Sequence, residues 1–424
     1  MLHDRLVESG GRGLSVRRLG GNRAGEIRLT RFLRHAAVSP QEMARTAAEK
    51  TAGRCHGRHV LAIQDTTVVR SQGGGGLYLH AVLAVDAEDE AILGLIDGQF
   101  LSRTEGKKSE RRNVPIEAKQ SHRWLQGANG AAEVCAGAAR LTVIADREAD
   151  IFEAFARRPP GAELLIRAAQ DRSLEDGERL FARADAQKPV ASATLELPAR
   201  PGRAARTARL AVRFMAACLA RPRTITDPAA PQAVTVNLVD LREQDAPAGA
   251  EPVHWRLLTT CPVSDAVQAL AVADLYRRRW AIEQLFRTLK TQGFDIEGVR
   301  IEAEQPRCNL VMAALVAAVT VQQLVHARDG KTGRLGVLRP ATDAFEPEDL
   351  PLLRAYCAKL EGKTARQKNP HPDGSLAYAA WVCARLGGWT GYYGKPGPVV
   401  MLQGWLEFQA AKRGAALLSH GHNL

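Results

Sequence analysis

Short runs of apolar and β-branched residues follow one another in the first third of the chain, a pattern typical of strands in a sheet. HVLAIQDTTVV (59–69), GLYLHAVLAVDA (76–87) and AILGLIDGQF (91–100) lie at hairpin distance, the second after a Gly-rich turn. We therefore predict three adjacent antiparallel strands. After a charged, helix-prone stretch at 103–127, LTVIA (141–145) has the composition of a buried strand and runs directly into DREADIFEAF, a predicted helix.

The second half of the chain begins with more strand-like segments and ends with helical ones. LLIRAA (164–169) predicts a further strand, and ATLEL, ARLAVRF, AVTVNLVDL and VHWRLLTT predict a β-rich insertion at about 170–262. A long helix is expected at about 267–292. A very apolar helix at 306–328 is better explained as core than as a membrane span, because it is short and unaccompanied. Between 340 and 424, three amphipathic stretches predict a small helical domain.

Together these elements predict an α/β fold in three parts. Residues 1–58 form an N-terminal basic arm, 59–335 form a core with a mixed sheet flanked by helices and carrying the insertion, and 340–424 form a C-terminal helical domain. A chain of 424 residues, 45% of them hydrophobic, is also long enough for two or three globular units.

An excess of positive charge indicates a polyanionic partner. The chain has 58 Lys and Arg against 46 Asp and Glu, a net charge of +12, which favours binding to the phosphates of nucleic acid. We interpret the N-terminal arginines as a DNA-contacting arm, with a solvated basic surface as the alternative; they are Arg17, Arg18, Arg23, Arg28, Arg31 and Arg34. Ser39-Pro40 after them predicts the start of a helix.

The remaining composition argues against several classes of protein. No apolar run reaches membrane-spanning length and the N-terminus lacks the apolar stretch of a secretory signal. We therefore expect no membrane partner and a cytoplasmic protein that is nucleoid-associated when bound to DNA. The seven cysteines are scattered and never form a CxxC pair, which argues against a disulfide framework and a zinc site.

Two aspartates occupy positions where a sheet could hold a metal ligand. Asp65 lies where the strand AIQDTTVV turns polar, although an aspartate that merely ends a strand is the alternative. Asp146 directly follows LTVIA and begins the predicted helix. Active sites of α/β sheets gather at such positions, and a helix N-cap would also explain this residue. Asp150, one helical turn later, is expected on the helix surface.

A third carboxylate lies in LYRRRWAIEQLFRTLK, within the long predicted helix. Four polar residues there are spaced by three, four and seven positions: Tyr276, Arg279, Glu283 and Lys290. This spacing puts them on one helical stripe, beside an apolar stripe that would dock on the core. A surface ladder of ion pairs would have the same spacing. In combination with the two aspartates, however, Glu283 would complete a triad of carboxylates.

Such a triad suits phosphoryl transfer. In-line displacement at phosphorus develops charge on the entering and leaving oxygens, and two divalent ions about 3.5–4 Å apart stabilise both. Mg²⁺ takes oxygen ligands and keeps several waters, so a few Asp and Glu side chains on rigid elements are sufficient. We therefore predict that Asp65, Asp146 and Glu283 hold two Mg²⁺ ions, for which Mn²⁺ would substitute.

Three ordered motifs carry these candidate residues. They are AIQDTT around Asp65, IADREADIF around Asp146, and the spaced signature Tyr276-x2-Arg279-x3-Glu283-x6-Lys290. The motifs resemble those of the DDE transposases of bacterial insertion sequences, in the transposon-five-like branch of insertion-sequence family four. RFLRHAAVSP, HWRLLTTCPV and SLAYAAWVCARLGGW are also similar to that family, so the resemblance covers nearly the whole chain.

The resemblance implies an RNase H-like core, a β-rich insertion before the Glu helix, and a C-terminal helical domain for dimerisation. It also implies cut-and-paste transposition, in which DNA ends are hydrolysed to a free 3′-hydroxyl, the flanking strand is released through a hairpin, and the end joins target DNA. Tyr276, Arg279 and Lys290 would contact phosphates of the DNA end. Trp255 would stack on a base flipped out during hairpin formation, although a tryptophan in an apolar strand is more often core.

The implied partners are double-stranded DNA, both the element's terminal inverted repeats and the target, and a second copy of the chain in a synaptic complex. The short stretch before Asp65 suggests a second hypothesis. This is a truncated, non-catalytic DNA-binding or dimerising copy that inhibits an intact transposase. A metal-dependent nuclease or resolvase, with the triad but without strand transfer, is a third. Terminal inverted repeats flanking the gene would favour the transposase.

Overall fold

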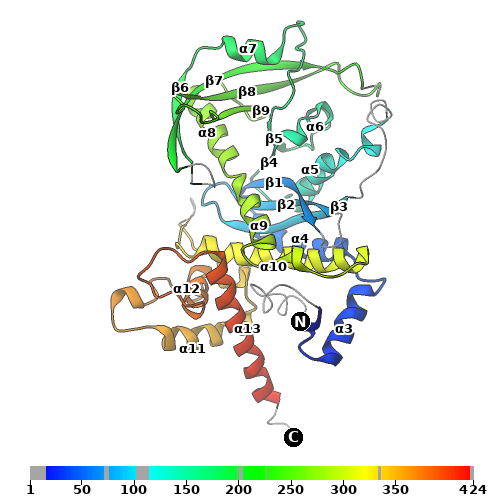
Figure 1. The fold of residues 1–424 in the computed structure, drawn as a ribbon. Helices are drawn as coiled ribbons and strands as arrows, with labels where there is room; N and C mark the ends of the chain where they lie inside the picture. The colour runs from blue at the N-terminus through cyan, green and yellow to red at the C-terminus, as the bar shows by residue number, and fades with distance from the viewer. Residues whose placement is uncertain are drawn as a thin grey trace. The chain divides into compact units, whose positions relative to one another are not determined.

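A mixed sheet of nine strands, in the hydrogen-bonded order β3-β2-β1-β4-β5-β9-β8-β7-β6, organises the fold (Figure 1). The structure is a computed structural model that describes residues 16–70, 76–101, 114–197, 199, 204–225, 227–332 and 336–420. Its strands are β1 (His59–Arg70), β2 (Gly76–Asp86), β3 (Ile92–Leu101), β4 (Arg140–Ala145), β5 (Ala162–Arg167), β6 (Ala191–Leu197), β7 (Arg206–Ala220), β8 (Ala233–Gln244) and β9 (His254–Thr259). Each segment predicted as a strand forms one.

The chain divides into two units. The first comprises residues 1–58, 66–102 and 281–424, and the second comprises 59–65 and 103–280. β1 and helix α9 (Trp280–Lys290) each begin in the second unit and end in the first. The three-part division predicted from the sequence stays a prediction. Three predicted segments lie partly outside the described residues: the Gly-rich turn, of which only Gly76 in β2 is described, the first part of the 103–127 stretch, and the first 15 residues of the predicted arm.

The sheet of the second unit is built on strands that are apolar on both faces. β4 is buried from Leu141 to Ala145, as expected for a parallel strand covered on both sides. β1 pairs with β4 in parallel from His59↔Arg140 to Ile63↔Ile144, and β5 pairs in parallel with β4. The strands of the predicted insertion continue this sheet, because β9 pairs antiparallel with β5, and β8, β7 and β6 follow.

The helices of the second unit are α5 (His122–Val134), α6 (Phe152–Ala156), α7 (Leu180–Ala186) and α8 (Ala266–Arg277), with 3-10 helices η1 (Ile116–Ala118) and η2 (Arg147–Ala149). The single helix predicted for DREADIFEAF is therefore wrong, because η2 and α6 are separated at Asp150. The surface position predicted for Asp150 is also wrong. Its buried carboxylate accepts hydrogen bonds from the amides of Ala169 and Gln170, which hold this residue outside a regular helix.

The long helix predicted at about 267–292 is interrupted. α8 ends at Arg277 and α9 begins at Trp280. The amides of Arg278 and Arg279 bond to carbonyls only three residues back, which tightens the chain between the two helices. A break of two residues changes the phase of the apolar pattern little, so the periodicity of the sequence does not reveal it.

The hairpin of β2 and β3 forms the sheet of the first unit with the end of β1. β2 and β3 are antiparallel, as predicted, and helices α4 (Pro40–Cys55) and α10 (Glu304–Ala327) pack against β3. Gly98 permits close packing on α10, because a Cβ at this position would lie 2.6 Å from Met312 Cε. α4 begins where the sequence predicts, with Ser39 as N-cap accepting from the amide of Glu42 and Pro40 in the first turn.

The remaining elements of the first unit are helical. They are α2 (Val16–Gly20), α3 (Arg23–Arg34), α11 (Leu350–Leu360), α12 (Leu376–Leu386), α13 (Pro398–His420), η3 (Ile296–Gly298), η4 (Ala341–Asp343), η5 (Pro347–Asp349) and η6 (Ala365–Gln367). The three helical stretches predicted near the C-terminus correspond to α11, α12 and α13. All seven cysteines are free thiols in the structure.

Helix α10 is the one helix among the described residues that is long and apolar enough to cross a membrane, judged by length and composition alone, so the prediction that no apolar run reaches that length is wrong. Within its most apolar window, 78% of the residues are buried inside the protein. Buried helices of globular cores pass the same test, so α10 is weak evidence for a membrane span. Its packing on β3 and α4 accounts for its apolar sequence.

Candidate active site

The parallel pairing of β1 and β4 brings two of the predicted carboxylates together. The last paired residues are Ile63 and Ile144, and Asp65 and Asp146 each follow two residues later. Because side chains alternate along a strand, both aspartates continue the face of the isoleucine pair, and neighbouring strands are about 4.8 Å apart. The second unit therefore carries Asp65 and Asp146 side by side: Asp65 lies within β1, and Asp146 directly follows the last residue of the neighbouring parallel strand β4.

Asp146 is also the N-cap of η2, as the alternative reading of the sequence predicts. Its backbone is extended, and its Oδ1 accepts a hydrogen bond from the amide of Glu148 at 2.9 Å. This bond fixes the orientation of the carboxylate, since the cap satisfies an amide that the helix cannot. A capping role and a ligand role are compatible, because the carboxylate has a second oxygen.

Asp65 is bound by the arginine of the chain segment between α8 and α9. Arg279 Nη1 donates to Asp65 Oδ2 at 2.9 Å, and the two side chains are 13% and 18% exposed. The pair is therefore partly buried, which makes its charge-assisted hydrogen bond stronger than a surface ion pair. The contact connects β1 to a residue 214 positions later in the sequence.

Tyr276 and Trp255 pack together beside Arg279. Their rings meet edge to face with centroids 5.4 Å apart, and the Arg279 guanidinium lies 5.8 Å from the centre of the Tyr276 ring. Burial raises the pKa of the Tyr276 hydroxyl, while Arg279 and Arg167 act to lower it. Trp255 is 9% exposed, as the alternative of a core tryptophan in an apolar strand predicts; its role in base stacking stays a prediction.

Two further arginines of the second unit, Arg167 and Arg123, interact electrostatically with residues of this site. The pairing of Ala145 with Ile166 puts Arg167, the last residue of β5, on the strand next to Asp146. Burial lowers the pKa of Arg167, and the like charges of Arg147 and Arg279 lower it further. Arg167 was not predicted from the sequence, although its position at the end of a parallel strand follows the same rule that selects Asp146.

Arg123 is the second residue that the sequence analysis missed. Arg123 Nη2 donates to Glu148 Oε2 at 2.6 Å, and Arg123 is 9% exposed. Burial lowers the pKa of Arg123, and the charges of Glu148, Asp146 and Asp65 oppose that effect. Nothing in the sequence around this residue distinguishes it from other arginines on helices.

Glu283 and Lys290 lie in the first unit, on α9. Glu283 is half-buried in the first turn of the helix. Lys290 Nζ donates to the carbonyl of Val68 at 2.5 Å and lies 3.7 Å from Glu297, and burial lowers the pKa of this ammonium. Within the described ranges, no three His, Cys, Asp or Glu side chains form a group that could hold a metal ion. The joining of Glu283 to the two aspartates stays a prediction.

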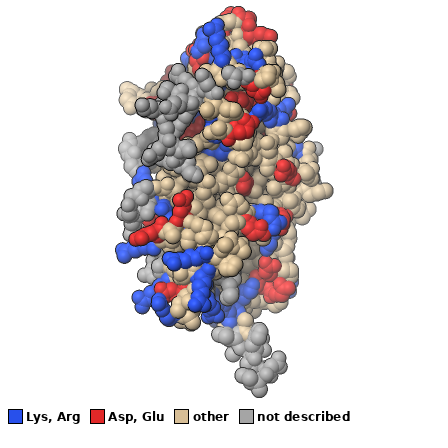
Figure 2. Space-filling view, turned by 90° about the vertical axis from the view of Figure 1, so that its right-hand side faces the viewer, with Lys and Arg blue, Asp and Glu red and all other residues tan. Residues whose placement is uncertain are grey.

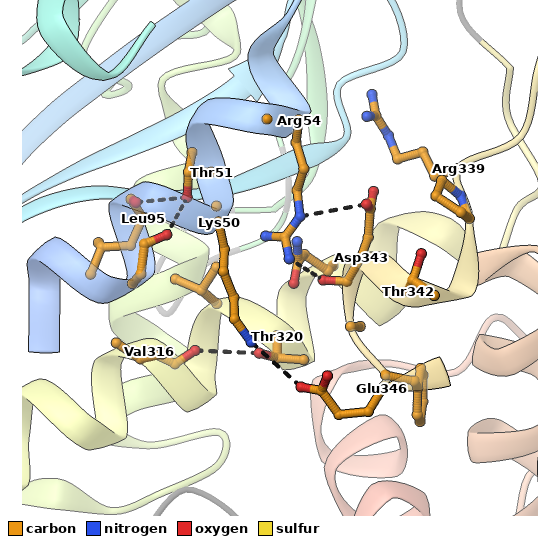
Figure 3. A pocket seen from close by; sticks show the side chains of 18 of the residues that line it. Lys50, Thr51, Arg54, Leu95, Val316, Thr320, Arg339, Thr342, Asp343 and Glu346 are labelled. Carbon is orange, nitrogen blue, oxygen red and sulfur yellow. Dashed lines mark hydrogen bonds and ion pairs between the residues drawn. The ribbon is translucent and has the colours of Figure 1, made fainter. Parts of the chain in front are cut away.

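A cavity of about 930 Å³ opens in the first unit among α4, α10, α13 and the segment of η4 and η5 (Figure 3). Ion pairs cross its walls, joining Lys50 to Glu346 (3.4 Å), Arg54 to Asp343 (3.5 Å) and Lys412 to Asp349 (2.7 Å). Arg54 also donates to the carbonyls of Leu93 and Asp343. Because charges of both signs are paired across the cavity, we interpret it as a gap between helices that these ion pairs hold together. No predicted site residue lines it.

Residues 140–319 match the family model of the transposase DDE domain. The match begins at β4, ends within α10 and includes Asp146 and Glu283, whereas Asp65 precedes it. It supports a DDE transposase, a class of enzymes that act on DNA and generally use divalent metals. The mixed sheet, its flanking helices and the C-terminal helices confirm the predicted α/β fold with an RNase H-like core.

Proposed function

We propose that the protein is a transposase that cuts its element out of DNA and joins it to a target, with Asp65, Asp146 and Glu283 as the catalytic triad. The observation that carries the proposal is the parallel register of β1 and β4, which sets the two aspartates side by side where β4 ends. The match to the transposase DDE domain covers residues 140–319, which include Asp146 and Glu283, and supports the same assignment. Membership of the transposon-five-like branch rests on the Tyr276 to Lys290 signature.

The side chains present suit a hard divalent ion. Asp65 and Asp146 offer carboxylate oxygens from adjacent rigid strands, and Mg²⁺ and Mn²⁺ prefer such ligands. With Glu283 as third ligand, these residues would hold two ions. When bound, the ions activate the attacking oxygen and stabilise charge on the leaving oxygen of the phosphodiester.

The cations and aromatic rings of the site would orient the DNA end. Arg279 and Lys290 would bind phosphates next to the scissile bond, and Tyr276 would donate to the same backbone. Trp255 would stack on a base that leaves the helix during hairpin formation. Because Trp255 is packed on Tyr276, that contact requires the ring to become accessible first. A second copy, bound through the C-terminal helices, would complete the synaptic complex.

The decisive experiment is an in vitro cleavage assay on duplexes carrying the terminal repeats that flank the gene. Asp65→Asn, Asp146→Asn and Glu283→Gln should each abolish cleavage while DNA binding and melting temperature stay close to wild type. Asparagine is the right replacement at Asp146 because it keeps the cap to Glu148 while removing the charge. Glu133→Gln, a change at an exposed glutamate of α5, is the matched control and should cleave normally.

The same assay separates the competing functions. Cleavage should require Mg²⁺ or Mn²⁺, with Ca²⁺ supporting binding only, since its looser coordination suits the reaction geometry poorly. A joined product with target DNA would exclude a simple nuclease or resolvase. A wild-type chain that binds ends and dimerises without cutting would instead support the inhibitory copy. Full activity of any one triad variant would remove that residue from the triad.

A further inference from the structure

The contact between Arg279 and Asp65 has a consequence for metal binding. The guanidinium donates to Asp65 Oδ2 at 2.9 Å, and both side chains are mostly withdrawn from water. Asp65 and Asp146 together supply two negative charges at the end of the β1 and β4 ladder. While Arg279 stays on Asp65, one of these charges is neutralised and a positive charge lies next to the space that a divalent ion would enter.

Arg279 also contacts an aromatic ring of its own unit while it binds Asp65. Its guanidinium lies 5.8 Å from the centre of the Tyr276 ring, within the range of cation–π contact, and it extends from the short segment between α8 and α9 rather than from the middle of a helix. A phosphodiester is also a better partner than a single carboxylate oxygen, because a guanidinium binds it with two parallel hydrogen bonds. Backbone phosphate of DNA can therefore draw Arg279 away from Asp65.

We infer that Arg279 is a positioning residue that keeps the divalent-ion affinity of Asp65 low until a DNA phosphate takes its guanidinium, so that metal binding is coupled to DNA binding. The inference rests on the proposed function and deepens it, because it assigns Arg279 a role before DNA arrives. Coupling of this kind is reciprocal: metal must strengthen DNA binding by the factor by which DNA strengthens metal binding.

The test measures Mn²⁺ binding to the whole 424-residue chain by electron paramagnetic resonance, without DNA and without turnover. Arg279→Ala should bind Mn²⁺ about tenfold more tightly than wild type, in the usual range of such couplings. Arg279→Lys, which keeps a positive charge, should stay close to wild type. Arg278→Ala is the matched control: it removes the preceding arginine, whose Nη2 binds Asp274 at 2.6 Å, and should leave Mn²⁺ affinity unchanged.

A second series identifies the ligand and the coupling. Asp65→Asn added to Arg279→Ala should cancel the gain in Mn²⁺ affinity. A duplex that ends at the cleavage site, and so has no scissile bond, should tighten Mn²⁺ binding to wild type about tenfold and have little effect on Arg279→Ala. The inference is overturned if folded Arg279→Ala, judged by its melting temperature, binds Mn²⁺ no better than wild type. This result is distinguishable from failure of the proposed function, which is an absence of cleavage by wild type whatever its Mn²⁺ affinity.

Discussion

Asp146 and Asp150, four residues apart after the same strand, have opposite environments. Asp146 is half-exposed at the edge of the sheet and caps η2. Asp150 is fully buried, and its Oδ1 accepts from Arg172 Nε at 3.0 Å and Nη2 at 2.6 Å, while its Oδ2 accepts from two backbone amides. The first residue is available for chemistry, and the second holds the chain after β5 against η2.

Removal of the buried partner should therefore be costly. Asp150→Ala leaves the Arg172 guanidinium, 5% exposed, without its counter-charge and should lower the free energy of unfolding by about 3–5 kcal/mol. The matched control is Glu117→Ala, which breaks an ion pair to Arg157 whose side chains are 52% and 41% exposed and should leave the free energy of unfolding nearly unchanged. Urea denaturation measures both. Similar losses in the two variants would contradict the structural role given to Asp150.

At the scale of elements, the C-terminal helices α12 and α13 are packed backbone to backbone through two glycines. A Cβ on Gly404 of α13 would collide with the carbonyl of Cys383 on α12, and a Cβ on Gly387 would collide with the carbonyl of Val400. Backbone atoms cannot move aside as a flexible side chain can. Both positions therefore require glycine because of the closeness of the helices, not because of an unusual φ.

The same substitution at two places in α13 tests this packing. Gly404→Ala should force the helices apart and lower the melting temperature, with a cost of about 1–3 kcal/mol or more, as for other overpacked positions. Gly414→Ala meets no neighbouring atom within 4 Å and should stabilise the helix by up to about 1 kcal/mol. Circular dichroism melting curves give both values. If the C-terminal helices also mediate dimerisation, Gly404→Ala should weaken the dimer and Gly414→Ala should not.

At the scale of the whole molecule, the net charge of +12 is not evenly available to DNA. Several arginines of the second unit are paired with acids: Arg179 with Asp171, Arg183 with Asp176 and Glu178, and Arg209 with Asp245. On α3, Arg28, Arg31 and Arg34 are exposed and have no ion-pair partner among the described residues. Figure 2 shows Lys and Arg side chains gathered toward the lower end of the face drawn there. The exposed arginines of α3 are the better candidates for phosphate contacts.

The salt dependence of DNA binding should separate the two groups. Changing Arg28, Arg31 and Arg34 together to Ala should reduce the slope of log affinity against log salt by about 3, roughly one for each lost phosphate contact. The control changes Arg179, Arg183 and Arg209 to Ala and should reduce the slope by less than about 1. Fluorescence anisotropy of a labelled duplex at about 50 to 200 mM salt measures both. A slope that the α3 substitutions leave unchanged would mean that these arginines form only a solvated basic surface.

The sequence by itself determined the strands, the α4 cap at Ser39, the C-terminal helices and the candidate carboxylates, because alternation, capping residues and turn residues act over a few neighbouring positions. Only the tertiary structure decided that Asp65 and Asp146 are in register, since strand pairing joins residues that lie far apart in the sequence. The burial of Asp150 and the break between α8 and α9 likewise could not be predicted from neighbouring residues. Each depends on a partner from a distant segment, as in the bond from Arg279 to Asp65, and local periodicity carries no information about such partners.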